Sequence, residues 1–254
     1  MLNSSARPTP KRSFVLNRTA LGVLLALVFS ARAYASDPTC SPKASLPPSE
    51  ERQPRNIDSL KDELRYYKCS GAYDRDFSQI IDQVISYVLK RAKAGGKLAL
   101  VLDIDETSLS NWAEINANDF GFVPHGSCTL PTGPCGDDAW EQLADATVLD
   151  TLRLFKVAKA NNIAVFFVSG RREKFKDATG QNLRKAGYSD WTDLLLRPDD
   201  DRSTVEYFKT TTRREIEEQG GYTIIANVGD QYSDLRGGHA EQVFKLPNPF
   251  YFIP

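Results

Sequence analysis

Histidine is scarce in this 254-residue chain, and so is any excess of charge of one sign. The two histidines, His125 and His239, are too few for a three-histidine zinc site, and no Arg-His-Gly run supports chemistry on a histidine nucleophile. The 32 Lys and Arg residues nearly match the 33 Asp and Glu residues, which argues against a nucleic-acid binder. With 41% hydrophobic and 26% charged residues, the composition is that of a globular protein with a sizeable core.

A hydrophobic run long enough to span a membrane is also lacking near the N-terminus. The apolar run Ala20–Phe29 is about half of the ~20 residues that a spanning helix needs. Basic residues precede it and the small residues of Ala33–Ala35 follow it, which is the pattern of a secretory signal. We therefore expect residues 1–35 to be a signal peptide cleaved after Ala35, giving a periplasmic or secreted protein with no membrane attachment. An uncleaved membrane anchor is the alternative.

Cysteine is sparse, and no Cys-x-x-Cys pair is present to bind zinc or exchange thiols. The four cysteines are Cys40, Cys69, Cys128 and Cys135. An even number in an exported protein favours disulfides, and four cysteines permit three pairings. Because Cys128 and Cys135 bracket a Gly/Pro-rich stretch, we expect them to form a local bridge, which leaves Cys40 to pair with Cys69.

Helix and strand patterns alternate along most of the chain. Residues 36–56 are instead rich in proline and poor in large apolar residues, which indicates a linker. The spacing of apolar residues predicts helices at 77–89 (continuing to Gly95-Gly96), 137–160, 171–186 and 209–219, and short apolar runs predict strands at 98–102, 163–168, 194–196 and 223–228. This alternation predicts an α/β fold with an open, mostly parallel sheet covered by helices on both faces.

Polar side chains follow the predicted strands at the edge where such sheets bind ligands. Asp103 and Asp105 follow the first strand two residues apart, so they share a face of extended chain. Two such carboxylates can act as nucleophile and as general acid and base, although an isolated Asp-x-Asp also fits a solvated turn. Ser169 follows the second strand, where its hydroxyl either holds a phosphate or caps the next helix.

The last predicted strand leads into a second acidic segment. Asp230 and Asp234 follow Gly229, and carboxylates at such a turn suit Mg²⁺, although Asp234 also fits the first turn of a helix as a cap. Lys209 lies on the helix before that strand, where a lysine is ordinarily solvated.

In this order, the four pieces resemble the four motifs of the haloacid dehalogenase (HAD) superfamily. The segments that carry the resemblance are Val101–Trp112, Phe167–Arg172, Lys209 with Arg213, and Ile225–Leu235. They look like the secreted acid phosphatases of subfamily IIIB, the branch of the plant acid phosphatases and vegetative storage proteins, with bacterial class B and class C relatives. The closing Lys245–Tyr251 is similar to that branch as well. The resemblance implies a Rossmann-like HAD fold over residues 57–254, with an N-terminal helical extension and a small cap insertion at about 112–137.

The resemblance also implies a reaction, the hydrolysis of phosphate monoesters through an aspartyl-phosphate. Asp103 would be the nucleophile, and Asp105 would protonate the leaving oxygen and then activate water. The implied ligands of Mg²⁺ are Asp103, the backbone carbonyl of Asp105, and Asp230, with Asp234 acting through water. Ser169 and Lys209 would hold the phosphoryl oxygens.

The expected insertion contains aromatic residues whose role the sequence leaves open. Trp112, Phe120 and Phe122, with His125, either stack on an aryl or nucleobase leaving group or form a minor core of the insertion. The expected substrate is accordingly a small phosphate monoester, with a nucleotide or an aryl phosphate as candidates.

Two other functions compete with this interpretation. A catalytically weak or inactive storage or binding protein is the first, because some plant relatives keep the fold without the nucleophile, whereas Asp103 is present here. A cysteine-dependent phosphatase is the second, because Cys69–Arg75 matches Cys-x5-Arg, but Asp74 in that loop opposes a reactive thiolate.

Overall fold

The computed structural model describes residue 40, residues 54–121 and residues 147–253. The expected signal peptide, most of the expected linker and insertion, and the expected Cys128–Cys135 bridge lie outside these residues. None of the helices in the described ranges has the length and apolar character needed to cross a bilayer.

Helix α1 (Ile57–Cys69) begins where the predicted linker ends. Its N-cap is Asn56, whose side chain accepts hydrogen bonds from the backbone of the first turn and so satisfies donors that the helix cannot. None of its residues is buried. The expected disulfide joins Cys40 to Cys69 at the end of this helix. The same bond consumes the sulfur that a Cys-x5-Arg phosphatase would need, so that alternative is wrong.

Helix α2 (Ala72–Ala92) follows after Gly71, which adopts the left-handed conformation that glycine tolerates best. It begins five residues before the apolar pattern that predicts it. Its buried residues recur at intervals of three and four and are Tyr73, Phe77, Ile81, Val84 and Val88. This apolar stripe is the side of the helix that faces the core.

A five-stranded parallel sheet forms the centre of the fold, in the order β5-β4-β1-β6-β7. The strands are β1 (Leu98–Leu102), β4 (Ala164–Arg172), β5 (Asp193–Arg197), β6 (Thr223–Gly229) and β7 (Val243–Lys245). All five residues of β1 are buried, as expected for a central parallel strand. The sheet confirms the predicted α/β fold, and β7 is a strand that the sequence did not predict.

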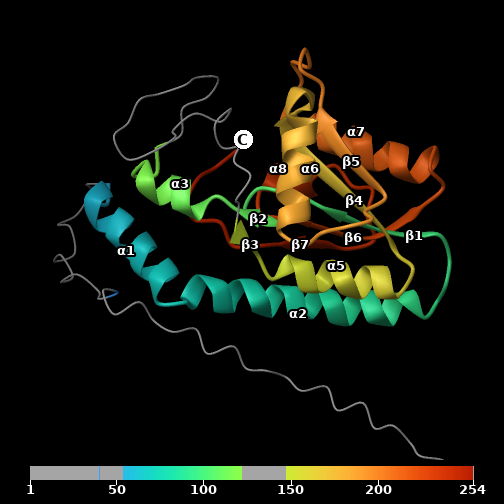
Figure 1. Cartoon of the computed structure of the whole chain (residues 1–254), viewed down its shortest axis with the longest axis horizontal. Coiled ribbons are helices and arrows are strands. Elements are labelled where there is room, and N and C mark those ends of the chain that lie inside the picture. The colour runs from blue at the N-terminus through green and yellow to red at the C-terminus, as the bar shows by residue number, and fades with distance from the viewer. Residues whose placement is uncertain (1–39, 41–53, 122–146, 254) are drawn as a thin grey trace, which may run out of the picture. The chain divides into compact units, whose positions relative to one another are not determined.

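Helices cover both faces of this sheet. They are α5 (Thr151–Ala160), α6 (Lys176–Lys185) and α7 (Val205–Glu218), in addition to α2. Along β1, Leu98, Leu100 and Leu102 join the large core cluster with α2 and α5, whereas Ala99 and Val101 join a smaller cluster with α7. Figure 1 shows α2 and α5 side by side along one side of the sheet, with α7 on the other. Because β1 pairs in parallel with both β4 and β6, the carboxyl ends of these three strands share one edge of the sheet.

Two predicted helices start too early. In the expected helix 137–160, Thr147–Val148 is instead strand β3, which pairs antiparallel with β2 (Leu109–Ser110). In the expected helix 171–186, strand β4 continues to Arg172, which pairs with Arg197 of β5, and α6 begins only at Lys176. Ser169 consequently lies within a strand, so the helix-cap alternative for this residue is wrong. Strand pairing with distant residues overrides the local helical pattern in both places.

Candidate active site

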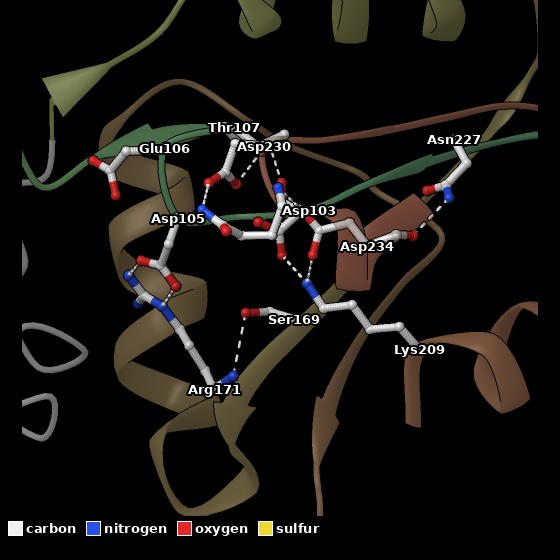
Figure 2. Close-up of polar contacts among 12 residues, drawn as sticks. Asp103, Asp105, Glu106, Thr107, Ser169, Arg171, Lys209, Asn227, Asp230 and Asp234 are labelled. Carbon is white, nitrogen blue, oxygen red and sulfur yellow. Dashed lines mark hydrogen bonds and ion pairs between the residues drawn. The ribbon is translucent and has the colours of Figure 1, made fainter. Parts of the chain in front are cut away.

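Three buried carboxylates converge at the carboxyl edge of the sheet. Asp103 directly follows β1, and its backbone N–H bonds to the carbonyl of Val228 on β6 at 3.0 Å. Asp230 follows β6, and Asp234 lies on the short helix α8 (Tyr232–Leu235). Oxygens of Asp103, Asp230 and Asp234 all lie within 4.8 Å of one another. Figure 2 shows these side chains pointing toward one another.

Lys209 of α7 reaches into this group from the side. Its Nζ lies 2.5 Å from Oδ1 of Asp103 and 2.6 Å from Oδ1 of Asp234. Only 4% of the lysine is exposed, so it is not the solvated residue that its sequence position alone would predict. Burial would lower the pKa of Lys209, but the two carboxylates outweigh burial and raise it. Asp103, Asp230, Asp234 and Lys209 are called the sheet-edge cluster below.

The sheet-edge cluster has more negative than positive charge. Burial, with the repulsion of Asp234, raises the pKa of Asp103 well above its ordinary value despite Lys209. Burial and Asp234 also raise the pKa of Asp230 to about 7. A bound cation would favour the ionised form of these carboxylates, because its positive charge would balance their excess negative charge. An all-oxygen donor set suits a hard cation such as Mg²⁺. The donors therefore fit the expected metal.

Asp230 is held in place by three hydrogen bonds to its carboxylate. Thr107 donates to Oδ1 at 3.0 Å, and Gln231 and Asn248 donate to Oδ2 at 2.8 and 2.7 Å. Such contacts from surrounding side chains orient a ligand before the metal binds.

Asp234 lies in a helix-capping position and also faces the other carboxylates of the cluster. It stands at the third position of α8, where Oδ2 accepts from the backbone N–H of Gln231 at 2.7 Å and completes a capping box. Its other oxygen binds Lys209. A Cβ atom on Gly229 would stand 2.4 Å from the Asp234 side chain, so only glycine leaves room for this arrangement. Asp234 is thus both a helix cap and a member of the cluster.

Asp105 lies beside the cluster but pairs with a different cation. Arg171 donates to both of its oxygens, at 2.6 and 3.0 Å, and Asn111 donates to Oδ1 at 2.8 Å. Burial would raise the pKa of Asp105, but the charge and hydrogen bonds of Arg171 outweigh burial and lower it. In this pairing Asp105 is ionised and able to accept a proton.

Glu106 is a member of the site that sequence reasoning missed. Its backbone has φ 48°, and its carboxylate is fully buried. The backbone and side chain of Asn111 donate to it at 2.5 and 3.2 Å, and the hydroxyl of Tyr251 donates at 2.8 Å. Burial, with the repulsion of Asp105, raises the pKa of Glu106 to about 7. The only signal in the sequence is its place directly after the Asp-x-Asp motif, where an acidic residue would ordinarily be solvated.

The structure brings Ser169 to the same edge but gives Trp112 other contacts. Ser169 is buried near the end of β4, and its hydroxyl accepts from the backbone of Arg171 at 3.2 Å. Trp112 begins helix α3 (Trp112–Ala117) and packs against Phe250 and Phe120, with ring centroids 4.9 and 6.0 Å away. These are contacts of a minor core, and a role of Trp112 toward substrate stays a prediction. Phe122 and His125 lie outside the described residues.

Comparisons with known proteins point to one family. The model of the HAD superfamily, subfamily IIIB (acid phosphatase), matches residues 50–254. Acid phosphatase 1 of Solanum lycopersicum is 30% identical over 76% of this chain and 74% of its own length. Vegetative storage protein 1 of Arabidopsis thaliana is 30% identical over 61% of this chain and 55% of its own length. The structure of the class C acid phosphatase from Bacillus anthracis has a similar fold, with a TM-score of 0.58 and 23% identity over 76% of this chain and 86% of that one.

Proposed function

The chain belongs to the acid phosphatases of HAD subfamily IIIB and is thus a phosphoric monoester hydrolase, and from this premise we propose that it is an exported, Mg²⁺-dependent enzyme that acts through an aspartyl-phosphate. The observation that carries the proposal is the sheet-edge cluster. It places a buried carboxylate, Asp103, 2.5 Å from a buried ammonium and within 4.8 Å of two further carboxylates.

Asp103 is the proposed nucleophile. One oxygen of its carboxylate attacks phosphorus, the bond from phosphorus to the ester oxygen breaks, and the phosphoryl group is carried on the carboxylate. Water then attacks phosphorus, which releases phosphate and restores Asp103. Lys209 contacts the proposed nucleophile and would stabilise the charge of the phosphoryl oxygens together with the hydroxyl of Ser169.

Asp105 is the proposed general acid and base. It must protonate the leaving oxygen in the first step and take a proton from water in the second. The ion pair with Arg171 lowers its pKa and so suits the second role. The first role requires that Asp105 bind a proton, which an acidic medium favours.

Mg²⁺ is the proposed cofactor, held by Asp103, the backbone carbonyl of Asp105, and Asp230, with Asp234 acting through water. When bound, it supplies positive charge that offsets repulsion between the attacking carboxylate and the phosphate. The proposed substrate is a small phosphate monoester such as a nucleotide or an aryl phosphate. We further propose that residues 1–35 are removed after Ala35 during export to the periplasm or the exterior.

The decisive experiment compares the wild type with Asp103→Asn. The wild type should release phosphate from para-nitrophenyl phosphate with Mg²⁺ and stop when EDTA removes the metal. Asp103→Asn should lose at least about 10³-fold in kcat, because it removes the attacking oxygen. The matched control, Asp200→Asn, changes an exposed carboxylate and should retain wild-type activity. Acid quenching during turnover should leave phosphate on the Asp103 peptide, detectable by mass spectrometry.

The same assay tests the storage or binding alternative. A folded wild-type protein that binds Mg²⁺ but releases no phosphate from any of several nucleotides, sugar phosphates and aryl phosphates would support storage or binding. It would contradict the proposed mechanism.

A further inference from the structure

The residues that follow β7 make several contacts with the site. Residues 246–253, called the C-terminal segment here, begin with a hydrogen bond from the backbone of Leu246 to the carbonyl of Gly229 at 2.8 Å. Leu246 is fully buried, and only 7% of Phe250 is exposed. The ring of Phe250 packs against Tyr73 of α2, with centroids 5.1 Å apart. Apolar packing therefore fixes the path of this segment past the carboxyl edge of the sheet.

One polar contact of the segment ends on the metal side of the site. Nδ2 of Asn248 donates to Oδ2 of Asp230 at 2.7 Å, while its Oδ1 accepts from the backbone of Phe250 at 2.9 Å. Gln231 is tied to the same segment, because its side chain accepts from the backbone of Ile253 at 3.1 Å while it donates to Asp230 at 2.8 Å. The segment thus holds the carboxylate of Asp230 through two side chains.

A second polar contact ends on the acid and base side. The hydroxyl of Tyr251 donates to Glu106 at 2.8 Å, and Glu106 accepts from Asn111 at 3.2 Å. The same Nδ2 of Asn111 donates to Asp105 at 2.8 Å. A continuous chain of hydrogen bonds therefore runs from Tyr251 through Glu106 and Asn111 to Asp105.

We propose that the C-terminal segment positions both halves of the catalytic site, Asn248 by orienting the metal ligand Asp230 and Tyr251 by orienting Asp105 through Glu106 and Asn111. This inference rests on the proposed function for the identity of the two halves. Packing alone would require only Leu246 and Phe250. The two polar side chains instead reach carboxylates with different roles, and their removal should have different consequences.

The experiment separates the two branches in the full-length protein. Asn248→Ala should weaken Mg²⁺ binding about 10-fold or more in isothermal titration calorimetry. Tyr251→Phe keeps the ring and removes only the hydroxyl. It should leave the Kd for Mg²⁺ within about twofold and lower kcat about 10-fold at unchanged KM. Matched controls are Asn161→Ala and Tyr207→Phe, both at exposed positions.

The outcomes that overturn the proposal are distinct from those that overturn the phosphatase mechanism. A wild-type Kd in Asn248→Ala, or a kcat in Tyr251→Phe equal to that of Tyr207→Phe, would show that the segment only completes the core. Should Asn248→Ala fail to fold, Asn248→Ser keeps a side-chain oxygen for the turn but is too short to reach Asp230, so it should weaken Mg²⁺ binding likewise. A wild type without phosphatase activity would refute the mechanism, while the calorimetry would still test Asn248.

Discussion

Charged side chains occur in two contrasting regions of this molecule. The sheet-edge cluster has three carboxylates and one ammonium, which contacts Asp103 and Asp234, and all four residues are buried. Between α1 and α3, Lys61 and Arg65 meet Asp119, whose side chain is 61% exposed. The same chemical groups are thus strongly coupled in one region and screened by water in the other.

The contrast shows where this fold tolerates unfavourable electrostatics. The buried cluster raises the pKa values of Asp103 and Asp230 because burial and mutual repulsion oppose their ionisation. Perturbed carboxylates of this kind are typical of catalytic sites and destabilise the protein that contains them. The ion pairs of Lys61 and Arg65 with Asp119 are exposed instead, and α1 buries none of its residues. The Cys40–Cys69 disulfide joins the end of α1 to the segment that precedes this helix in the chain.

The largest expected effect follows from removing the cation of the cluster. Lys209→Met should lower the free energy of unfolding by about 3–5 kcal/mol without metal, because it leaves Asp103 and Asp234 buried and unpaired. Mg²⁺ should restore part of this loss by supplying charge, whereas kcat should stay at least about 100-fold below the wild type. Urea denaturation with and without Mg²⁺ measures the first effect. The control is Arg214→Met, at an exposed position on the same helix. An unfolding free energy equal to that of the wild type would show that the cluster is not strongly coupled.

A smaller effect is expected at the other region when the disulfide is removed. Replacing Cys40 and Cys69 by serine frees a loop with a sequence separation of 29 and should cost about 2–4 kcal/mol of stability. The value of kcat should change less than about twofold, because the hydrogen-bond partners of the cluster among the described residues lie outside α1. Denaturation and steady-state kinetics on the double variant check both points. A large loss of kcat would mean that the two regions are coupled after all.

The smallest effect is expected for the exposed ion pairs. Asp119→Asn should cost less than about 1 kcal/mol at pH 7, and asparagine tolerates the φ of 53° found there. Hydrogen bonds from Lys61 and Arg65 lower the pKa of Asp119. A lowered carboxyl pKa contributes stability at pH values above its unfolded value, and that contribution is lost as the pH falls through the folded value. The difference in stability between Asp119→Asn and the wild type, measured by thermal denaturation, should therefore shrink below about pH 4. A difference in stability that persists at lower pH would show that the ionised Asp119 carboxylate is not its source.

Much of the sheet could be predicted from the sequence, since its central strands are short apolar runs. The strand at 98–102 was predicted to the residue, because β1 is buried on both faces and carries no polar residue. The sequence does not predict β7, because a strand of three residues is too short to show a pattern. Thr147–Val148 was assigned to a helix because its strand depends on pairing with Leu109–Ser110, which local periodicity does not encode.

The candidate site was predictable where its residues directly follow strands. Asp103 and Asp230 follow β1 and β6 and lie close together, and Lys209 of helix α7 joins them as the order of the motifs implies. Glu106 and Tyr251 were not recognised, because their contact joins residues 145 positions apart and depends on a turn with a positive φ at Glu106. Neither feature leaves a periodic signal in the sequence.

The parallel order of the strands also has a kinetic consequence. β1 pairs with β4 and β6, and Lys209 meets Asp103 across 106 sequence positions. Long-range pairings of this kind form slowly, whereas the turns of a helix such as α2 form from neighbouring residues. During refolding from urea, the helical circular dichroism signal should therefore recover before the hydrolysis of phosphate monoesters. The rate at which activity returns would then measure how fast the sheet assembles around β1.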